Sequence, residues 1–276
     1  MPIEWRFING LEGALTAAPG AASAAVMMIL LSPAKTLDFD SAVSDDATRP
    51  RFAAEAGRIA HAAAGIGAKG LSELMHISPT LAELNHGRFK RFARAEKRPA
   101  IRAFAGDVYR GFDAVSADSD TIAFAQDHVR ILSGLYGMLR PLDDIRPYRL
   151  EMGTKWAPGG GKLTDHWGDK VAKALASDLR ADGSKLLINL ASNEYFAVVK
   201  GQLPKTVRIV APDFRVRTAK GLRFQSFIAK VARGAMARWL CEERVADPAA
   251  LTAFDADGWR FDAEGSTADK PLFVRD

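Results

Sequence analysis

Two short apolar runs, far apart in the chain, restrict the fold more than any other feature. They read MMILL at 27–31 and LLINL at 186–190. Neither run alternates with charged residues, so each is typical of a strand that is buried on both faces of a sheet. Amphipathic stretches of helical period lie between and after them. We therefore expect an α/β (mixed α+β) fold in which helices flank a mixed sheet.

The length of 276 residues is compatible with a single domain. We expect this domain at 28–276, because no linker rich in Pro, Gly or Ser divides it. Residues 1–27 are expected to be a flexible N-terminal extension or a misassigned start, since they make a poor signal peptide. No segment resembles a membrane span. Cys241 is the single cysteine, which fits a reducing compartment, so a cytoplasmic location is expected.

Local patterns predict the remaining elements. A helix is expected to begin at Ser32-Pro33, where Ser suits an N-cap and Pro suits the first helical position. Other helices are expected at 51–64, 119–129, 163–183 and 230–245, and two short ones within 71–92. Strands are expected at 100–106, 130–134, 206–216 and 222–230, with a final pair at 258–262 and 272–276.

Motifs for common cofactors and metals are missing from the sequence. No G-x-G-x-x-G follows either apolar run, and PGGGKL at 158–163 lacks the first Gly and the final Ser or Thr of a phosphate-binding loop. No two histidines are three or four residues apart, and there is no cysteine cluster, so a zinc site of standard spacing is not expected. We expect no cofactor and no metal. No nucleophile–base pair identifies catalytic residues, which favours a role other than catalysis.

Basic residues are concentrated in two parts of a chain whose net charge is +5. The first cluster covers 88–102, where Phe89 and Phe92 lie between the cations, and the second covers 200–233. Such segregation can build a face that binds the phosphates of nucleic acid, or it can be an ordinary solvated surface. The candidate phosphate ligands in these clusters are Arg88, Lys90, Arg91, Arg94, Lys230 and Arg233.

The two short helices expected within 71–92 are similar to a helix-hairpin-helix element. In that element, backbone N–H groups at a helix N-terminus contact one phosphate, whatever the sequence of the nucleic acid. The turn here is Ser78-Pro79-Thr80, which makes Ser78 a candidate contact. It has none of the glycines that let a backbone approach a phosphate closely. A simple corner between two helices is the alternative.

The stretch SGLYGMLRPLDDIRPYRLEMG, at 133–153, has an unusual concentration of functional side chains. Arg140 and Arg146 each precede a proline, which disfavours helical geometry for both. Their guanidinium groups, and that of Arg149, can bind phosphate or carboxylate in a bidentate manner. Three interpretations remain open. The stretch is a rigid loop that is ion-paired internally, an anion pocket, or a catalytic site in which Tyr148 or Glu151 transfers protons.

Both apolar runs end in segments that carry polar side chains. Ser32 and Lys35 follow the first run, and Ser192 follows the second. Ligands commonly bind at the edge of a sheet where parallel strands end. We therefore expect these segments and the stretch at 133–153 to line one cleft, with Lys35 as an anion ligand. The other candidates for its lining are Ser32, Tyr136, Tyr148, Glu151, Ser192 and Tyr195.

Five segments carry a resemblance to a known family. They are MILLSPAKTLDF, AFAGDVYRGF, ILSGLYGMLRPLDDIRPYRLEMG, INLASNEYF and KVARGAMARW. In this order, and over nearly the whole chain from Met28 onward, they resemble the peroxide stress resistance protein YaaA family. The resemblance implies a cytoplasmic protein of the hydrogen peroxide response that is associated with lower free intracellular iron. It also implies a positively charged cleft, a helix-hairpin-helix element at 71–92 and binding to duplex DNA.

The function expected from this resemblance is binding of double-stranded DNA without sequence preference, which helps to limit iron-dependent oxidative damage. The alternative is an enzyme that acts on a nucleotide or another phosphorylated small molecule, with an unidentified anion as ligand. Its site would combine Lys35, Tyr136, Arg140, Arg149, Glu151, Ser192 and Tyr195. Direct iron sequestration is disfavoured by the lack of a His/Cys cluster.

Overall fold

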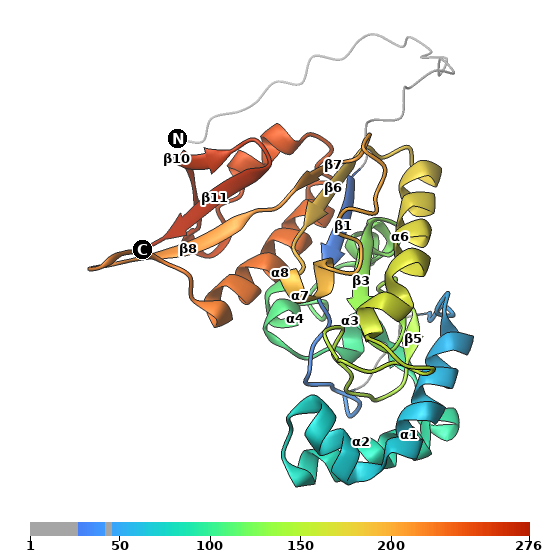
Figure 1. The fold of residues 1–276 in the computed structure, drawn as a ribbon. Coiled ribbons are helices and arrows are strands. Elements are labelled where there is room, and N and C mark those ends of the chain that lie inside the picture. The colour runs from blue at the N-terminus through green and yellow to red at the C-terminus, as the bar shows by residue number, and fades with distance from the viewer. Residues whose placement is uncertain (1–26, 42–45) are drawn as a thin grey trace, which may run out of the picture.

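A five-stranded sheet in the order β4-β3-β1-β6-β7 lies at the centre of the computed structural model (Figure 1). The structure describes residues 27–41 and 46–276. The strands of this sheet are β1 (Met27–Leu31), β3 (Val129–Ser133), β4 (Gly137–Leu139), β6 (Leu186–Asn189) and β7 (Arg208–Val210).

The two apolar runs of the sequence are neighbours in this sheet. β1 and β6 pair in parallel, with Met28 opposite Leu187, and every residue of both strands is buried. β3 and β7 continue the parallel arrangement on either side, whereas β4 is antiparallel to β3. The expected α/β fold with a mixed sheet is therefore confirmed.

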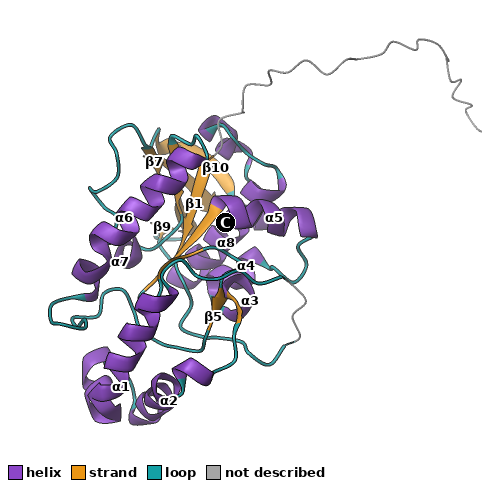
Figure 2. Cartoon of the chain, turned by 90° about the vertical axis from the view of Figure 1, so that its right-hand side faces the viewer, coloured by secondary structure: helices purple, strands orange, loops and turns teal. Residues whose placement is uncertain are grey.

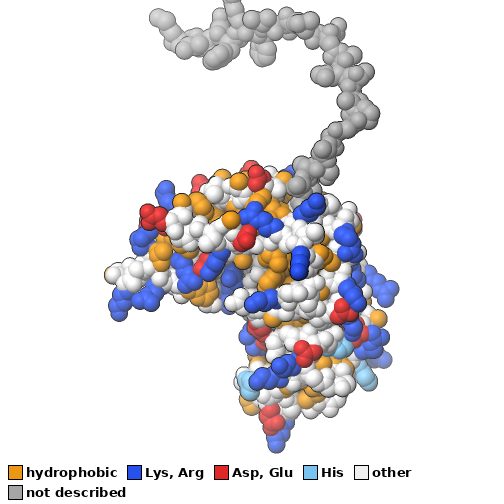
Figure 3. Space-filling model, turned by 45° about the horizontal axis from the view of Figure 1, so that its top comes forward, with side chains coloured by type: hydrophobic (Ala, Val, Ile, Leu, Met, Phe, Trp, Pro, Cys, Tyr) orange, Lys and Arg blue, Asp and Glu red, His pale blue; other side chains and the backbone are white. Residues whose placement is uncertain are grey.

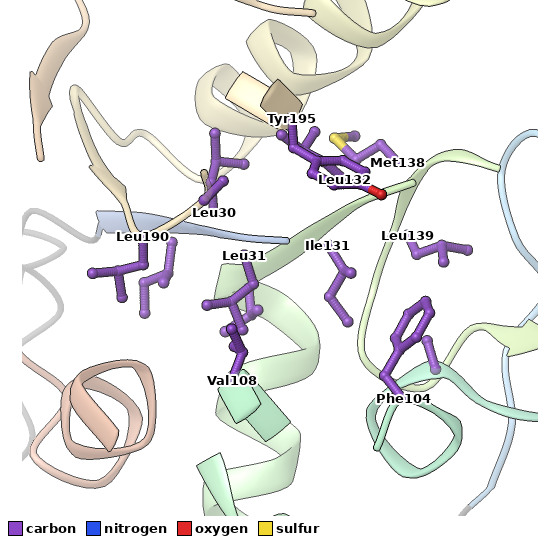
Figure 4. Packing of buried hydrophobic residues seen from close by; sticks show 14 of the residues in the cluster. Leu30, Leu31, Phe104, Val108, Ile131, Leu132, Met138, Leu139, Leu190 and Tyr195 are labelled. Carbon is purple, nitrogen blue, oxygen red and sulfur yellow. The ribbon is translucent and has the colours of Figure 1, made fainter. Parts of the chain in front are cut away.

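Helices cover both faces of the central sheet (Figures 1 and 2). One face carries α6 (Leu163–Ala181) and the short α7 (Asn193–Phe196), and the other carries α4 (Asp107–Phe112), α5 (Ser119–His128) and α8 (Ser226–Glu242). In Figure 4, Leu31 and Val108 point toward each other on one side of the sheet, and Tyr195 lies over Leu132 on the other. The core thus fills both layers between sheet and helices.

A second sheet, in the order β10-β11-β8-β9, extends from the central one (Figure 1). The aromatic rings of Phe214, Phe254, Trp259 and Phe273 pack together in its core. The expected final pair of strands is confirmed, with Phe261 opposite Phe273. The strands are β8 (Asp213–Thr218), β9 (Gly221–Arg223), β10 (Arg260–Thr267) and β11 (Lys270–Arg275).

Two helices project away from the central sheet at the lower end of Figures 1 and 2. They are α1 (Ala53–Met75) and α2 (Pro79–Lys90), which pack on each other. They are followed by η1 (Phe92–Arg94), α3 (Ala100–Ala103) and a small sheet of β2 (Arg98–Pro99) and β5 (Asp144–Ile145). Two further short helices, η2 (Pro248–Ala253) and η3 (Ala256–Gly258), precede β10.

Three local predictions were wrong. Residues 100–106 contain α3 instead of a strand, which fits the high helix propensity of alanine directly after a proline. Within 222–230, β9 ends at Arg223 and α8 begins at Ser226, because Ala229, Ala232 and Met236 recur at helical spacing and are buried. The helix expected to begin at Ser32-Pro33 is absent, because residues 32–41 contain no helical turn.

The segment after Ser32 stays extended because it pairs with another part of the chain. Leu37 forms a β-bridge with Phe104, and the amide of Ala105 donates to the carbonyl of Thr36 at 3.0 Å. These bonds satisfy backbone groups that a helix would otherwise have used.

The extension expected at 1–27 lies, except for Met27 in β1, outside the described residues. Cys241 is buried in α8, and burial raises the pKa of its thiol to about 12. Within the described ranges, no helix combines the length and the apolar character needed to cross a membrane.

Candidate functional site

The ends of β1 and β6 meet at the carboxyl edge of the central sheet. The amide of Ser192, just after β6, donates to the Ser32 hydroxyl at 2.9 Å. The Tyr109 hydroxyl, from α4, donates to the Ser32 carbonyl oxygen at 3.0 Å. The structure thus joins the two polar strand ends that the sequence analysis placed in one cleft, although Ser32 caps no helix.

Two of the predicted anion ligands converge on one carboxylate beside this edge. Arg149 Nε donates to Glu151 Oε1 at 3.0 Å, and Lys35 Nζ lies 3.5 Å from the same oxygen. The Glu151 side chain is 14% exposed, whereas that of Lys35 is 64% exposed. Two cations against one carboxylate leave a net positive charge at this point, and the exposed Lys35 side chain can contact an incoming anion.

All four tyrosines of the chain are buried, and their side chains form a connected group under this edge. The Tyr148 hydroxyl is 2.6 Å from the Ser133 hydroxyl, and the Tyr136 hydroxyl accepts the backbone N–H of Arg146 at 2.9 Å. The rings of Tyr136 and Tyr148 are 5.6 Å apart. The remaining members, Tyr109 and Tyr195, lie close enough to Tyr148 to interact electrostatically with it.

Burial raises the pKa of every tyrosine in this group, because a buried phenolate loses its hydration. The pKa of Tyr136 rises to about 12 and that of Tyr148 rises further, despite hydrogen bonds that favour the ionised form. The pKa values of Tyr109 and Tyr195 are raised well above the usual value. The tyrosines are therefore neutral near pH 7 and serve as hydrogen-bond donors and acceptors rather than as bases.

A spectrophotometric titration at 295 nm should show this directly. In the native protein, we expect no phenolate to form near pH 10, the usual pKa of tyrosine, and ionisation to begin at about pH 12 or together with unfolding. Since the folded-state pKa values are raised, the stability that they contribute is fully present below pH 10 and is lost as the pH rises through the folded values. In concentrated urea, all four groups should titrate near pH 10, and a native titration with the same midpoint would contradict the burial of the group.

The other two arginines of the stretch at 133–153 have structural partners. The backbone N–H of Arg140 donates to Asp143 at 2.9 Å, and its guanidinium lies 3.3 Å from the same carboxylate. Arg146 donates to the carbonyl oxygens of Ala93 and Ala95 and lies over the Phe92 ring. Arg140 is thus paired within the stretch, whereas the side-chain partners of Arg146 lie outside it, at 92–95. Arg149 and Glu151 form the charged group beside Lys35.

The helix pair contains a glycine break that the sequence analysis missed. Gly67 interrupts α1 with φ 75° and ψ 165°, a conformation open almost exclusively to glycine. A Cβ at Gly65 or Gly67 would meet no other atom within 4 Å, so neither glycine is required for packing. Ser78, the predicted contact, caps α2 by accepting the N–H of Leu81 at 3.3 Å. The three glycines of GIGAKG at 65–70 are the sequence feature that could have predicted this break. It was missed because the run lies within an alanine-rich helical pattern.

The first basic cluster remains largely without acidic partners. Within 27–41 and 46–276, no carboxylate lies within ion-pair distance of Arg88, Lys90, Arg91 or Arg94. The second cluster differs, because several of its cations are paired. Lys230 lies 4.0 Å from Asp107, and Arg208, Arg215 and Arg217 also have carboxylate partners. Arg233 is half-buried and has none among the described residues.

Within the described part of the chain, no three His, Cys, Asp or Glu side chains come together in a group that could hold a metal ion. His166 lies 2.6 Å from Glu55 and 3.4 Å from the ammonium of Lys170, and Lys170 forms an ion pair with the same carboxylate at 3.5 Å.

Comparisons with known proteins find relatives that match nearly the whole chain. The chain is 55% identical over 251 residues to a UPF0246 protein of Rhizorhabdus wittichii, which covers 90% of this chain and 99% of that protein. UPF0246 proteins of Roseobacter denitrificans and Ralstonia nicotianae are each 46% identical over 90% of this chain, and 98% and 99% of their own lengths are covered.

A family model described as peroxide stress protein YaaA matches residues 27–265, from the first residue of β1 into β10. The match includes the central sheet, the charged group at its carboxyl edge and the projecting helix pair. This match supports a role in peroxide stress, and the chain belongs to the peroxide stress protein YaaA family.

Proposed function

We propose that this protein binds duplex DNA through phosphate contacts, without sequence preference, and thereby helps to limit iron-dependent oxidative damage. The observation that carries the proposal is the unpaired basic charge of the projecting helices. Between Lys69 and Arg94 the chain has five cations against two carboxylates, Glu73 and Glu83. Among the described residues, none of these cations has a carboxylate partner. Lys69, Lys90, Arg91 and Arg94 are also exposed and available to phosphates, whereas Arg88 is half-buried and donates to Asn85 at 3.4 Å.

The glycine break in α1 supports the same proposal. It exposes a helix start at Ala68, and a backbone without side chains at Gly65 and Gly67 can approach a phosphate closely. We propose that this turn, rather than the one at Ser78, makes the hairpin contact. Gly67→Val should distort the turn and weaken binding to duplex DNA, while circular dichroism of the variant should show the helical content retained.

The shape of the molecule is compatible with a duplex ligand. Figure 3 shows a hollow between the part that carries the second sheet and the part that carries the projecting helices, with Lys and Arg side chains along its edge. A surface of this kind provides the electrostatic attraction on which binding without sequence preference depends.

A matched pair of double variants tests the proposal. Lys90→Gln/Arg94→Gln should weaken binding of a fluorescent duplex in anisotropy titrations and flatten the slope of log affinity against log salt by about 1.8, since each lost phosphate contact removes about 0.9. Arg180→Gln/Lys185→Gln removes the same charge from exposed positions on and after α6 and should leave the slope unchanged. If both double variants lose the same affinity and slope, the effect would depend on net charge alone, which would contradict phosphate binding by the helix pair.

The link to oxidative damage follows from the cations that duplex DNA holds. A protein that covers phosphates displaces these cations, and displaced ferrous iron no longer reacts with peroxide at the strand. Plasmid nicking by ferrous iron and hydrogen peroxide should therefore fall as the protein saturates the DNA. Unchanged nicking at saturation would contradict this link.

The second candidate is an enzyme that acts on a nucleotide or another phosphorylated small molecule. The convergence of Lys35 and Arg149 on the partly buried Glu151 favours it, since an anion held by the cations would lie beside a carboxylate that can move a proton. A thermal-shift screen of phosphorylated metabolites would support it if one compound stabilises the protein but not Arg149→Ala. Loss of duplex binding in the same variant would instead assign Arg149 to the DNA surface.

A further inference from the structure

A separate cavity of about 310 Å³ lies where β6 and β7 end and β8 begins. It is distinct from the group around Glu151, because none of Lys35, Arg149 and Glu151 lines it. Its walls come from both sheets, from α7 and from α8, and therefore bring together residues far apart in the chain. The polar and aromatic side chains in its lining are Asn189, Asn193, Asp213, Arg215, Phe224, Arg233 and Lys270.

The cavity is cationic. Arg215 donates to Asp213 Oδ2 at 2.9 and 3.1 Å, and Lys270 Nζ lies 3.3 Å from the same oxygen. Burial alone would raise the pKa of Asp213, but these two cations outweigh burial and lower it. Asp213 is therefore ionised near pH 7 and offsets one of the three positive charges, so the cavity keeps a net charge of about +2.

Arg233 is the least satisfied polar group of the cavity. Its Nε atom is buried and has no hydrogen-bond partner. The rest of its guanidinium also forms no hydrogen bond or ion pair with a described residue. Burial lowers the pKa of Arg233, and only the charge of Asp213 opposes this. A guanidinium with unused donors is costly to bury unless an anion binds it. Its planar fork matches the oxygens of a phosphate.

Phe224, also in the lining, provides a surface on which a planar group can stack. The Phe224 side chain is 48% exposed, and the Arg215 guanidinium lies 5.5 Å from the centre of its ring. An exposed aromatic ring among cations is typical of sites where a nucleobase stacks while its phosphate is held nearby. Asn189 uses its side-chain oxygen to accept the N–H of Ala191 at 3.1 Å, which leaves its amide N–H groups for another acceptor.

From these contacts we infer that this cavity binds a nucleoside 5′-monophosphate, with the phosphate on Arg233 and Lys270 and the base on Phe224. The volume is at the lower end of the range for small-molecule sites, which fits one nucleotide rather than a dinucleotide. The same chemical group occurs in a free mononucleotide and at the phosphorylated end of a DNA strand. The first source does not depend on the proposed function, whereas the second rests on it.

Isothermal titration of the full chain with AMP, adenosine and inorganic phosphate tests the inference. AMP should bind at least tenfold more tightly than either fragment. Arg233→Ala should weaken AMP binding at least tenfold, and Phe224→Ala should weaken binding of AMP but not of phosphate. Arg180→Gln/Lys185→Gln, at exposed positions that do not line the cavity, should bind AMP as the wild type does. Because Arg233 makes no hydrogen bond or ion pair within the described residues and its burial is unfavourable, Arg233→Ala should not lower the melting temperature.

The two sources are separated with DNA. A linear duplex with 5′-phosphates should bind more tightly than the same duplex with 5′-hydroxyls, and Phe224→Ala should abolish the difference, if strand ends occupy the cavity. AMP binding without this difference would assign the cavity to free nucleotides. The inference is overturned if neither AMP nor the phosphorylated end is preferred, or if Arg233→Ala changes neither. Binding of the duplex with 5′-hydroxyls is measured separately. If this duplex does not bind although AMP does, the proposed function fails while the inference about the cavity stands.

Discussion

Gly234→Ala is expected to lower the free energy of unfolding by about 3 kcal/mol. Gly234 of α8 lies against α4, where an added Cβ would overlap the carbonyl oxygen of Val108 and lie 2.7 Å from the amide nitrogen of Phe112. Gly111 of α4 faces α8 in the same way, so the two helices meet backbone to backbone. Overlap with backbone atoms cannot be relieved by rotating a side chain, and it outweighs the roughly 1 kcal/mol that alanine gains in helix propensity.

Urea unfolding followed by circular dichroism measures this effect. Gly57→Ala is the matched control, because a Cβ at this position of α1 would meet no atom within 4 Å. It should stabilise the protein by about 0.5–1 kcal/mol. A Gly234→Ala variant as stable as the wild type would show that α4 and α8 do not pack as closely as the structure has them. The proposed anion ligands Lys230 and Arg233 lie on α8, so their position depends on the same packing.

Asp178→Asn is expected to destabilise the protein by about 3 kcal/mol. Asp178 of α6 accepts from Arg130 Nε and from Arg51 Nη2, each at 2.6 Å. The side chains of Asp178 and Arg130 are 9% and 7% exposed, so the substitution leaves a buried guanidinium without its counter-ion. Breaking a buried pair by removing one partner costs more than the pair itself contributes, because the remaining charge is not solvated.

An exposed ion pair of the same helix provides the comparison. Asp169 lies 2.7 Å from Lys173, and both side chains are more than 70% exposed. Asp169→Asn should change the free energy of unfolding by less than about 0.5 kcal/mol, since exposed pairs contribute little. Similar losses in the two variants would contradict the assignment of Asp178 as the buried counter-ion. Thermal or urea unfolding at one pH, for both variants and the wild type, is sufficient.

The sequence predicted those parts of the fold that depend on local pattern. The apolar runs that became β1 and β6 are fully buried, as their lack of alternation and their short length indicated. The prediction for Ser32 failed because the N-cap signal is local, whereas the bridge from Leu37 to Phe104 joins distant segments. Residues 222–230 show the same limit, since alternating apolar residues there fit a strand as well as a helix start.

The candidate site was predictable to a similar extent. The segments after the two apolar runs were expected to line one cleft, and the amide of Ser192 does donate to the Ser32 hydroxyl. The cleft itself stays a prediction. Which arginine would pair with which carboxylate did not follow, because Arg140, Arg146 and Arg149 are equivalent in sequence terms and differ only in their tertiary neighbours. The cavity around Arg233 was not predicted, since its lining comes from five separate segments of the chain.

The salt dependence of duplex binding tests the central claim most directly. Fluorescent duplexes of several sequences are titrated with the wild-type protein at several salt concentrations, and every duplex should bind. If about six phosphates are contacted, its affinity should fall by roughly 10³-fold between 50 and 200 mM salt. The same steep slope is expected for duplexes of unrelated sequence. Absence of binding at low salt, or an affinity that does not change with salt, would contradict the claim that this protein holds DNA through its unpaired basic side chains.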